Sequence, residues 1–411
     1  MNRFVLLIAT IAISAVLGGC SNNSVSADPP TDFSATPGDS AVTLTWTAAP
    51  DVEYWLFYAT GSTVTSSNWA DIGGKAVINA KSPYTITGLA NNSTYSFTMN
   101  ARKGGGPGGS GAPTQVVVPR FAGSKWTVGT SLGIGTLNGI AAASTINVIV
   151  GTGGVVFAGT NGTVATSRTN PAVPANLNAV AHGGQGFVAV GAAGTVIFSS
   201  DATTWTTKVS GTIAELLAVT SPGTGAFMAV GAGGTTIFSV DATTWTTKTS
   251  GTTQNLNAVT FGSGRYVAVG AAGTIVTSVD GTTWQTVVSN TTNDLRAVAL
   301  GTFTTVTGTG STATTTVNNI FVAMGAAGTV LTSGDAITWV SRATISANTI
   351  NALAFGGQFV AVGNAGSIFT STDGVTWEAQ LSGTSNNLTS LARTAVGYTA
   401  VGVAGTVLTS F

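Results

Sequence analysis

Short runs of alternating apolar and polar residues, separated by turn residues, fill most of this chain. Alternation with a period of two predicts half-buried antiparallel strands, and no long helical period interrupts it. In the last two thirds of the chain the runs recur around tryptophans spaced 40, 39, 55 and 38 residues apart: Trp205, Trp245, Trp284, Trp339 and Trp377. A spacing near 40 residues indicates a repeat architecture.

Each of these tryptophans ends an Asp-x-x-Thr-Trp phrase, and a pair of glycines three residues apart lies upstream. The glycine pairs occur at 191/194, 231/234, 270/273, 325/328, 363/366 and 402/405, with a looser copy at 159/162. Each of the seven copies accommodates four strands: an inner Leu-Asn-Ala-Val type, a Tyr-Val-Ala-Val-Gly type, a Gly-Thr-Ile-Val-Thr-Ser type and the Trp strand. Four strands in ~40 residues predict one blade of a β-propeller.

The two ends of the repeat complete each other. Trp126 precedes Leu137 by 11 residues, the same interval that separates every later Trp from the next inner strand, yet Trp126 has no copy before it. The last copy ends at Phe411 without a Trp strand. We therefore expect an all-β seven-bladed propeller over residues 120–411, whose first strand, within 124–130, completes the seventh blade and removes two open edges.

Two blades depart from the repeat. The first has no Trp strand signal and carries Pro171 and Pro174 in its place, which is acceptable only at an edge. The fifth is long because residues 301–317 insert a Thr-rich stretch between its first two strands. We expect a protruding hairpin there.

Residues 29–119 predict a separate β-sandwich. Val42, Leu44 and Trp46 alternate on one strand, and Tyr95 begins another inward-facing set. With Pro30 at its start and Leu89 six residues before Tyr95, this segment resembles a fibronectin type III domain. We expect the glycine run at 104–111 to be a hairpin loop and the tryptophans to pack rather than to form a glycan platform.

The N-terminus resembles a bacterial lipoprotein signal. Residues 1–19 combine Arg3 with a short apolar stretch, and Leu17-Gly-Gly-Cys20 resembles the lipobox at which the cysteine is acylated and the chain is cleaved. The resemblance implies lipidation of Cys20, and Ser21 after it implies the outer membrane, facing either the periplasm or the exterior. Residues 20–28 would form the tether.

The amino-acid composition argues against several classes of function. Charged residues are 7% of the chain, and 14 basic and 14 acidic residues cancel. A nucleic-acid partner is disfavoured, because phosphate contacts require clustered Lys and Arg. Cys20 is the only cysteine and His182 the only histidine, so we expect no disulfide within the chain, no metal site and no Ser-His-Asp catalysis. His182 falls in an otherwise apolar repeat position, where a packed imidazole is expected.

The Asp-x-x-Thr-Trp phrase resembles the Asp-box of sialidase-like (BNR) propellers, and the whole repeat resembles propellers related to photosystem II assembly and stability factors. The resemblance implies that the aspartate accepts backbone N–H groups in a hairpin and that the tryptophan packs between blades. It assigns structural roles to Asp201, Trp205, Asp241, Trp245, Asp280, Trp284, Asp335, Trp339, Asp373 and Trp377. Sialidase activity is disfavoured because the arginines fall in different repeat positions. Lys208, Lys248 and Arg342 follow the box tryptophans on the outermost strand, where we expect them to discourage edge-to-edge pairing.

The blades differ chemically at the loops that enter the inner strands, the predicted rim of the central channel. Glu215 and Asp294 could act as a carboxylate pair on a glycan, whereas an amide-rich rim suits a neutral partner. We expect a non-enzymatic envelope lipoprotein that needs no cofactor and binds a protein, with a glycan-binding or glycan-cleaving protein as the alternative. The candidate ligand rim is Asn176, Glu215, Asn255, Asp294, Arg296 and Asn387.

Overall fold

A computed structural model describes residues 24–411, except 134, 161–165, 169–174, 308–313, 396 and 411. The predicted signal peptide, Cys20, Ser21, Pro171 and Pro174 lie outside the described residues. Contacts divide the chain into two compact units, Met1–Pro119 and Arg120–Phe411, which are described separately. Among the described residues, no helix is long and apolar enough to cross a membrane.

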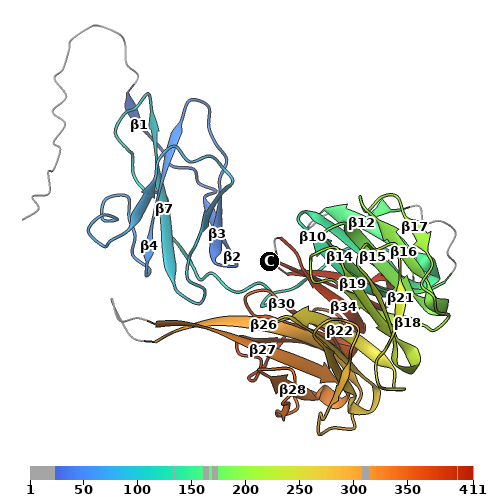
Figure 1. The fold of residues 1–411 in the computed structure, drawn as a ribbon. Helices are drawn as coiled ribbons and strands as arrows, with labels where there is room; N and C mark the ends of the chain where they lie inside the picture. The colour runs from blue at the N-terminus through green and yellow to red at the C-terminus, as the bar shows by residue number, and fades with distance from the viewer. Residues whose placement is uncertain are drawn as a thin grey trace, which may run out of the picture. The chain divides into compact units, whose positions relative to one another are not determined.

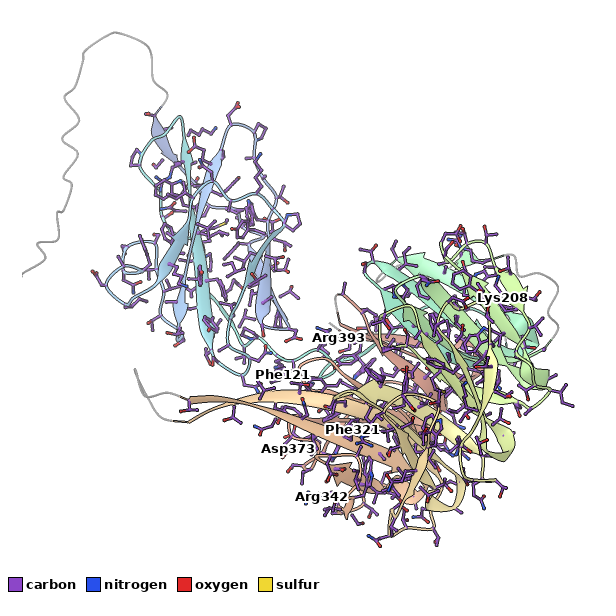
Figure 2. The ribbon with its side chains drawn as sticks, in the orientation of Figure 1. Phe121, Lys208, Phe321, Arg342, Asp373 and Arg393 are labelled. Carbon is purple, nitrogen blue, oxygen red and sulfur yellow. The ribbon has the colours of Figure 1, made fainter. Side chains whose placement is uncertain are left out.

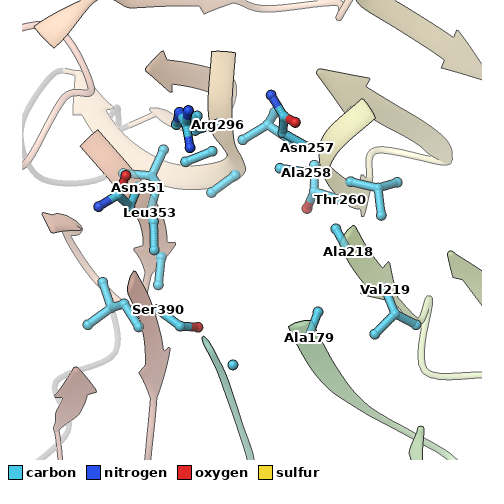
Figure 3. Close-up of a pocket in the computed structure, with 18 of the residues that line it drawn as sticks. Ala179, Ala218, Val219, Asn257, Ala258, Thr260, Arg296, Asn351, Leu353 and Ser390 are labelled. Carbon is cyan, nitrogen blue, oxygen red and sulfur yellow. The ribbon is translucent and has the colours of Figure 1, made fainter. Parts of the chain in front are cut away.

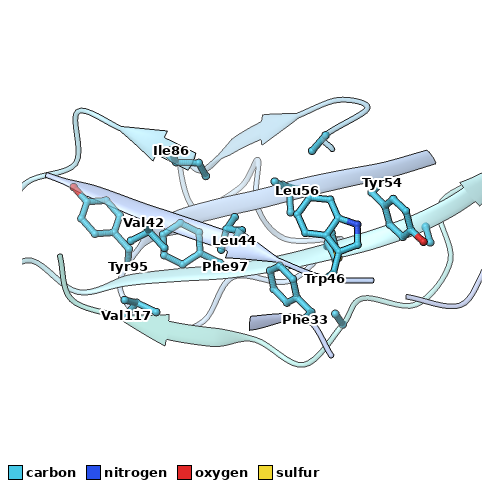
Figure 4. Close-up of a cluster of buried hydrophobic side chains, with 14 of the residues drawn as sticks. Phe33, Val42, Leu44, Trp46, Tyr54, Leu56, Ile86, Tyr95, Phe97 and Val117 are labelled. Atoms are coloured by element: carbon cyan, nitrogen blue, oxygen red, sulfur yellow. The ribbon is translucent and has the colours of Figure 1, made fainter. Parts of the chain in front are cut away.

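The first unit is a β-sandwich (Figure 1). The alternating apolar residues predicted to face inward do so: Leu44, Phe97 and Met99 are fully buried between the sheets, and Trp46 packs edge-on against Tyr54 (Figure 4). One sheet has the order β1(Val25–Ala27), β7(Tyr95–Lys103), β4(Glu53–Thr60), β5(Lys75–Val77), with β8(Gln115–Val117) also on β7; the other has the order β2(Ser34–Gly38), β3(Ala41–Thr45), β6(Tyr84–Thr87).

Two details of the sandwich match the sequence prediction. The Tyr95 hydroxyl accepts the backbone N–H of Ala90 at 3.0 Å, which fastens the loop before β7. The glycine run is a loop that leads into β8, and the backbone N–H of Ala112 returns to the Met99 carbonyl at 2.7 Å. Trp69 stacks obliquely on Phe57 with ring centroids 5.6 Å apart, and the Arg102 guanidinium lies 3.5 Å from the ring centroid of Trp55. The tryptophans of this unit therefore pack within it.

The second unit contains seven four-stranded antiparallel sheets and is a β-propeller. The first four blades, each in chain order from the inner strand outward, are β10(Leu137–Ala143), β11(Ile146–Gly151), β12(Val156–Thr160), β13(Thr166–Ser167); β14(Leu177–Gly183), β15(Gly186–Gly191), β16(Val196–Ser199), β17(Thr206–Lys208); β18(Leu216–Thr220), β19(Phe227–Gly231), β20(Thr235–Ser239), β21(Thr246–Thr249); and β22(Leu256–Gly262), β23(Arg265–Gly270), β24(Ile275–Ser278), β25(Gln285–Val287).

The other three blades include the closure predicted from the two ends of the repeat. They are β26(Leu295–Thr307), β27(Thr314–Gly325), β28(Val330–Ser333), β29(Val340–Ser341); β30(Ile350–Phe355), β31(Phe359–Gly363), β32(Ile368–Ser371), β33(Glu378–Gln380); and β34(Leu388–Arg393), β35(Tyr398–Gly402), β36(Val407–Ser410), β9(Thr127–Val128). The long hairpin of the fifth blade is also present, with β26 paired to β27 from Leu295 to Thr307 (orange in Figure 1).

The predicted closure is confirmed in atomic detail. Strand β9 pairs antiparallel with β36, with Val128 opposite Leu408 and Thr127 opposite Thr409. The adjoining Trp126 is 8% exposed, donates its indole N–H to the Gly123 carbonyl at 2.8 Å and packs in a cluster from the sixth and seventh blades. The N-terminal strand of the propeller therefore occupies the place of a blade tryptophan strand and joins the ends of the ring.

Buried clusters lie between neighbouring blades rather than within one blade. Trp205 of the second blade packs with Val148 and Ala158 of the first, and Trp245 of the third packs with Val188 and Val190 of the second. Because each sheet buries both faces against its neighbours, a blade on its own would expose its apolar residues. Trp205 and Trp245 therefore pack between neighbouring blades.

Tight turns connect the second and third strands of every blade. The middle residue of each turn has a left-handed backbone, as at Ala193 with φ 52° and Gly233 with φ 61°, and in six of the seven turns a backbone N–H closes the turn, as from Thr195 to Ala192. The second glycine of each pair has positive φ beside the left-handed middle residue, as at Gly194 with φ 68°. The first glycine is extended, as at Gly191, where a Cβ would lie 2.0 Å from the Asn176 carbonyl oxygen. In the first blade the turn lies at Gly151 and Gly154, not at the predicted pair 159/162. The turns are η1(Thr152–Gly154), η2(Ala192–Gly194), η3(Ala232–Gly234), η4(Ala271–Gly273), η6(Ala326–Gly328), η7(Asn364–Gly366) and η8(Val403–Gly405).

Candidate functional site

The predicted rim residues lie where each chain connection enters an inner strand, beside the tight turn of the preceding blade. The side-chain oxygens of four of them accept a hydrogen bond from the backbone N–H of the middle residue of that turn. The bonds join Gly153 to Asn176 (2.9 Å), Gly233 to Asn255 (2.9 Å), Ala272 to Asp294 (2.9 Å) and Ala365 to Asn387 (2.8 Å). Because the left-handed turn directs this N–H away from its own sheet, the N–H finds its hydrogen-bond acceptor in a side chain of the next blade. These oxygens hold neighbouring blades together.

A second set of side chains joins the inner strands around the ring. Each inner strand has a β-bulge one residue after its first leucine or isoleucine, and the bulged side chain reaches the next inner strand. Asn257 donates to the Leu295 carbonyl at 2.9 Å, and Thr389 donates to the Leu137 carbonyl across the closure. The remaining donors are Asn138 to Leu177 (2.9 Å), Asn178 to Leu216 (2.9 Å) and Asn351 to Leu388 (2.8 Å).

Two bulge positions break this pattern. Leu217 in the third blade and Arg296 in the fifth replace the asparagine. The Glu215 carboxylate, at the rim of the third blade, accepts the amide of Asn178 at 2.9 Å. Arg296 is exposed and forms no hydrogen bond or ion pair within the described part of the chain. Of the six predicted rim residues, Arg296 alone lines the central cavity.

The cavity occupies the centre of the ring and has a volume of about 500 Å³ (Figure 3). Asparagines and Arg296 lie at the end where the inner strands begin, and Arg296 is the only charged residue in the lining. Further along the strands, apolar side chains of β22, β26 and β30 also reach the cavity, although polar groups contribute most of the exposed lining. Its apolar side chains include Val259, Phe261, Val298, Leu300, Leu353 and Phe355. A volume of this size is within the range of small-molecule sites.

The Asp-x-x-Thr-Trp hairpins lie at the opposite end of the blades, between the third and fourth strands. Asp241 accepts the backbone N–H groups of Thr243 at 2.8 Å and Thr244 at 2.7 Å, and the Ser239 hydroxyl at 3.0 Å. Hydrogen bonds from the N–H of Thr244, and then of Thr243, lower the pKa of Asp241. Equivalent bonds hold Asp201, Asp280, Asp335 and Asp373. The serine two residues earlier was not identified from the sequence, although it recurs in all five phrases.

Charged side chains on the outer strands contact their own blades. The Arg342 guanidinium donates to the Thr332 hydroxyl at 2.8 Å, and the Lys208 ammonium lies 5.7 Å from the ring centroid of Phe198 (Figure 2). His182 is exposed at the surface, but its ring lies 4.7 Å from Phe187, centroid to centroid, and partial desolvation lowers the pKa of the imidazole. Within the described ranges, no group of His, Cys, Asp and Glu side chains is arranged to hold a metal ion.

Comparisons with known proteins address the fold. Residues 28–117 match the family model of the fibronectin type III domain. No curated protein matches the chain. Three similar solved structures are "YCF48 bound to D1 peptide" (TM-score 0.55, 16% identity, 69% of this chain and 94% of that one), "YCF48 from Cyanidioschyzon merolae" (0.53, 18%, 69% and 98%) and a streptogramin B lyase (0.58, 10%, 71% and 99%). At these identities the likeness shows the fold alone. The chain therefore joins a fibronectin type III domain to a β-propeller.

Proposed function

We propose that this chain is a non-enzymatic cell-envelope lipoprotein that presents its propeller to a protein partner. The Leu-Gly-Gly-Cys phrase ending at Cys20 supports lipidation at that residue, and Ser21 supports the outer membrane as its address. In this arrangement the acyl chains hold the N-terminus at the bilayer, and the fibronectin type III domain separates the propeller from it.

The observation that carries the binding proposal is a set of exposed aliphatic side chains on one face of the propeller. Val209 is 85% exposed and Ile213 is 92% exposed, four residues apart in one connection between blades. Val288 and Leu381 follow their box tryptophans by the same four residues as Val209 and are 74% and 93% exposed. Equivalent repeat positions lie on the same face, so these side chains share the rim end. Burial in a protein interface would remove them from water.

A solved structure supports peptide binding by this fold. The structure titled "YCF48 bound to D1 peptide" resembles this chain with a TM-score of 0.55. Its title states that YCF48 is bound to a peptide, and its likeness in fold suggests the same kind of partner for this propeller. Because the two chains are only 16% identical, this support concerns the scaffold and transfers no residue.

The arrangement of acids and histidine supports a binding role rather than catalysis. Asp294 caps a turn of the preceding blade, Glu215 is bonded to Asn178, and His182 lies beside Phe187. A glycosidase would need two carboxyl groups directed at one sugar ring. No contact of Glu215 or Asp294 favours the glycan alternative over a protein partner.

Cross-linking and affinity capture from native envelopes test the binding face. We expect a Val209→Asp/Ile213→Asp variant to lose partners that the unmodified chain captures. The matched control is Val240→Asp, since Val240 is 66% exposed but lies at the opposite end of the blades, beside the Asp241 hairpin. Equal capture by both variants would refute this face as the binding surface. Loss of radiolabelled palmitate incorporation in Cys20→Ala tests the anchor separately.

A further inference from the structure

Two neighbouring hollows lie at the rim end of the second and third blades. The first, of about 650 Å³, is lined by Lys208 and by the connection that follows it, including Val209 and Ile213. The second, of about 760 Å³, is lined by Lys248 and mostly by threonine, serine and glycine residues of the third blade, and it shares Thr212 with the first. Both hollows are shallow and open to solvent, and together they form one groove across two blades, the rim groove.

The rim groove contains two cations and no anion. Its lining includes Lys208 and Lys248 but no aspartate or glutamate, although the whole chain has equal numbers of acidic and basic residues. Neither ammonium group forms an ion pair with a described residue, and Lys208 lies beside the ring of Phe198 (Figure 2). The electrostatic potential of the groove is therefore positive, which favours an anionic partner.

The same groove offers apolar contacts and hydrogen-bond donors. Val209 is 85% exposed and Ile213 is 92% exposed, so a partner that covers them gains from removing both side chains from water. In the second hollow, the exposed hydroxyl groups of Thr247, Thr249 and Thr253 form no hydrogen bond with described residues. These hydroxyl groups can donate to carboxylate and peptide carbonyl oxygens. The lining thus matches a peptide that carries both acidic and aliphatic side chains.

Two other occupants fit the rim groove less well. A second copy of the chain that presented the same groove would place lysine against lysine, which is repulsive. A bilayer surface would need a continuous apolar patch, but Thr249 occupies the repeat position in the third blade that Val209 has in the second. An extended peptide needs no such patch, because it contacts separate hollows with separate side chains.

We propose that the rim groove binds an extended peptide segment of the partner that combines acidic and aliphatic residues. Its carboxylates contact the ammonium groups of Lys208 and Lys248, and its aliphatic side chains pack against Val209 and Ile213. This inference rests on the proposed protein-binding face and specifies the chemistry of the segment that this face recognises.

Selection of random dodecapeptides displayed on phage, with the purified full chain as bait, tests the proposal. We expect the selected peptides to be enriched in Asp and Glu close to Leu, Ile or Val and depleted in Lys and Arg. The tightest of them, synthesised and measured by fluorescence anisotropy, should bind Lys208→Glu/Lys248→Glu ~10-fold more weakly, because like charges replace two exposed ion pairs. Raising the NaCl concentration from about 50 mM to about 500 mM should also weaken binding.

Two further variants separate charge from folding. Lys208→Gln/Lys248→Gln removes the cations without adding anions and should give an intermediate affinity. Arg342→Glu is the matched control, because Arg342 follows its box tryptophan by the same three residues as Lys208 but does not line the groove. We expect it to bind the peptide as the unmodified chain does, and thermal melts followed by circular dichroism check that each variant is folded.

The proposal is overturned if no peptide is selected, if the selected peptides are not enriched in acidic residues, or if Lys208→Glu/Lys248→Glu binds them as well as the unmodified chain does. It is also overturned if the Cys20→Ala chain sediments with phosphatidylglycerol vesicles and the lysine variants abolish this, since the groove would then bind lipid head groups. Envelope capture distinguishes the two proposals. Partners that are lost by Val209→Asp/Ile213→Asp but retained by Lys208→Glu/Lys248→Glu would support the protein-binding face and refute an acidic segment.

Discussion

The hydrogen bonds between inner strands predict a measurable contribution of single asparagines to the stability of the ring. Asn257 donates to the Leu295 carbonyl at 2.9 Å, and Leu295 is fully buried. Asn257→Leu preserves the approximate size of the side chain but leaves that carbonyl without its amide partner. An unsatisfied buried polar group costs about 1–3 kcal/mol, so we expect the free energy of unfolding to fall by about 2 kcal/mol.

The size of the propeller sets the corresponding change in melting temperature. The unit runs from residue 120 to 411. At roughly 2 cal/mol/K per residue, its unfolding entropy is about 0.6 kcal/mol/K, so a loss of about 2 kcal/mol lowers the Tm by about 3 °C. Differential scanning calorimetry resolves a shift of this size, and urea unfolding followed by tryptophan fluorescence measures the free energy directly.

The preceding blade offers a matched control. Leu217 occupies the position that Asn257 has in the next blade, so Leu217→Asn adds an amide where the chain has none. Because it loses some apolar burial and gains a donor near the Leu256 carbonyl, we expect its stability within about 1 kcal/mol of the unmodified chain. An Asn257→Leu variant that melts like the unmodified chain would show that the bond contributes nothing. Equal losses in both variants would show that shape, and not the bond, matters there.

Three further predictions concern other parts of the propeller. Trp126→Ala should lower the free energy of unfolding, measured in urea, by about 3–5 kcal/mol. Deleting residues 124–130 should lower the Tm further than this single substitution does, and an unchanged Tm would refute closure by β9. Ala193→Gly should raise the free energy of unfolding by about 1 kcal/mol, since alanine is strained at φ 52°; a loss in urea titration would contradict this. Bonds from the N–H of Thr338 and then of Ile337 lower the pKa of Asp335 to about 2, below its unfolded value near 3.9. Stability from this carboxylate is therefore complete above about pH 4 and lost as the pH falls toward 2, and Asp335→Asn should flatten a plot of Tm against pH in that range.

Much of the fold was predictable because its determinants are local or repeated. The 11-residue interval from Trp126 to Leu137 predicted strand β9, and the insertion after Gly301 predicted the β26–β27 hairpin. The turn glycines were predictable because positive φ is a property of a few neighbouring residues. The candidate rim residues lie where the inner strands begin, because their places in the repeat are also local features of the chain.

The hydrogen bond that each rim side chain forms was not predictable, because its partner lies in another blade. Asn255 and Arg296 occupy neighbouring rim positions of the repeat, yet Asn255 caps Gly233 and Arg296 lines the cavity. The difference arises from the bulge, which turns one residue of each inner strand toward the next blade. Whether a bulged side chain reaches the next blade depends on the distance between two inner strands, which are about 40 residues apart in sequence.

The sequence by itself determined the number of blades, the closing strand and the two-unit organisation, since a period, its phase and its interruptions are visible in one dimension. Only the tertiary structure decided which polar side chains form hydrogen bonds between blades and which remain available for other contacts. Asn176, Asn255, Asp294 and Asn387 accept bonds that hold blades together, whereas Arg296 has no such bond among the described residues. The physical reason is that hydrogen bonds are satisfied in space, and closing seven sheets into a ring brings together donors and acceptors that the chain keeps far apart.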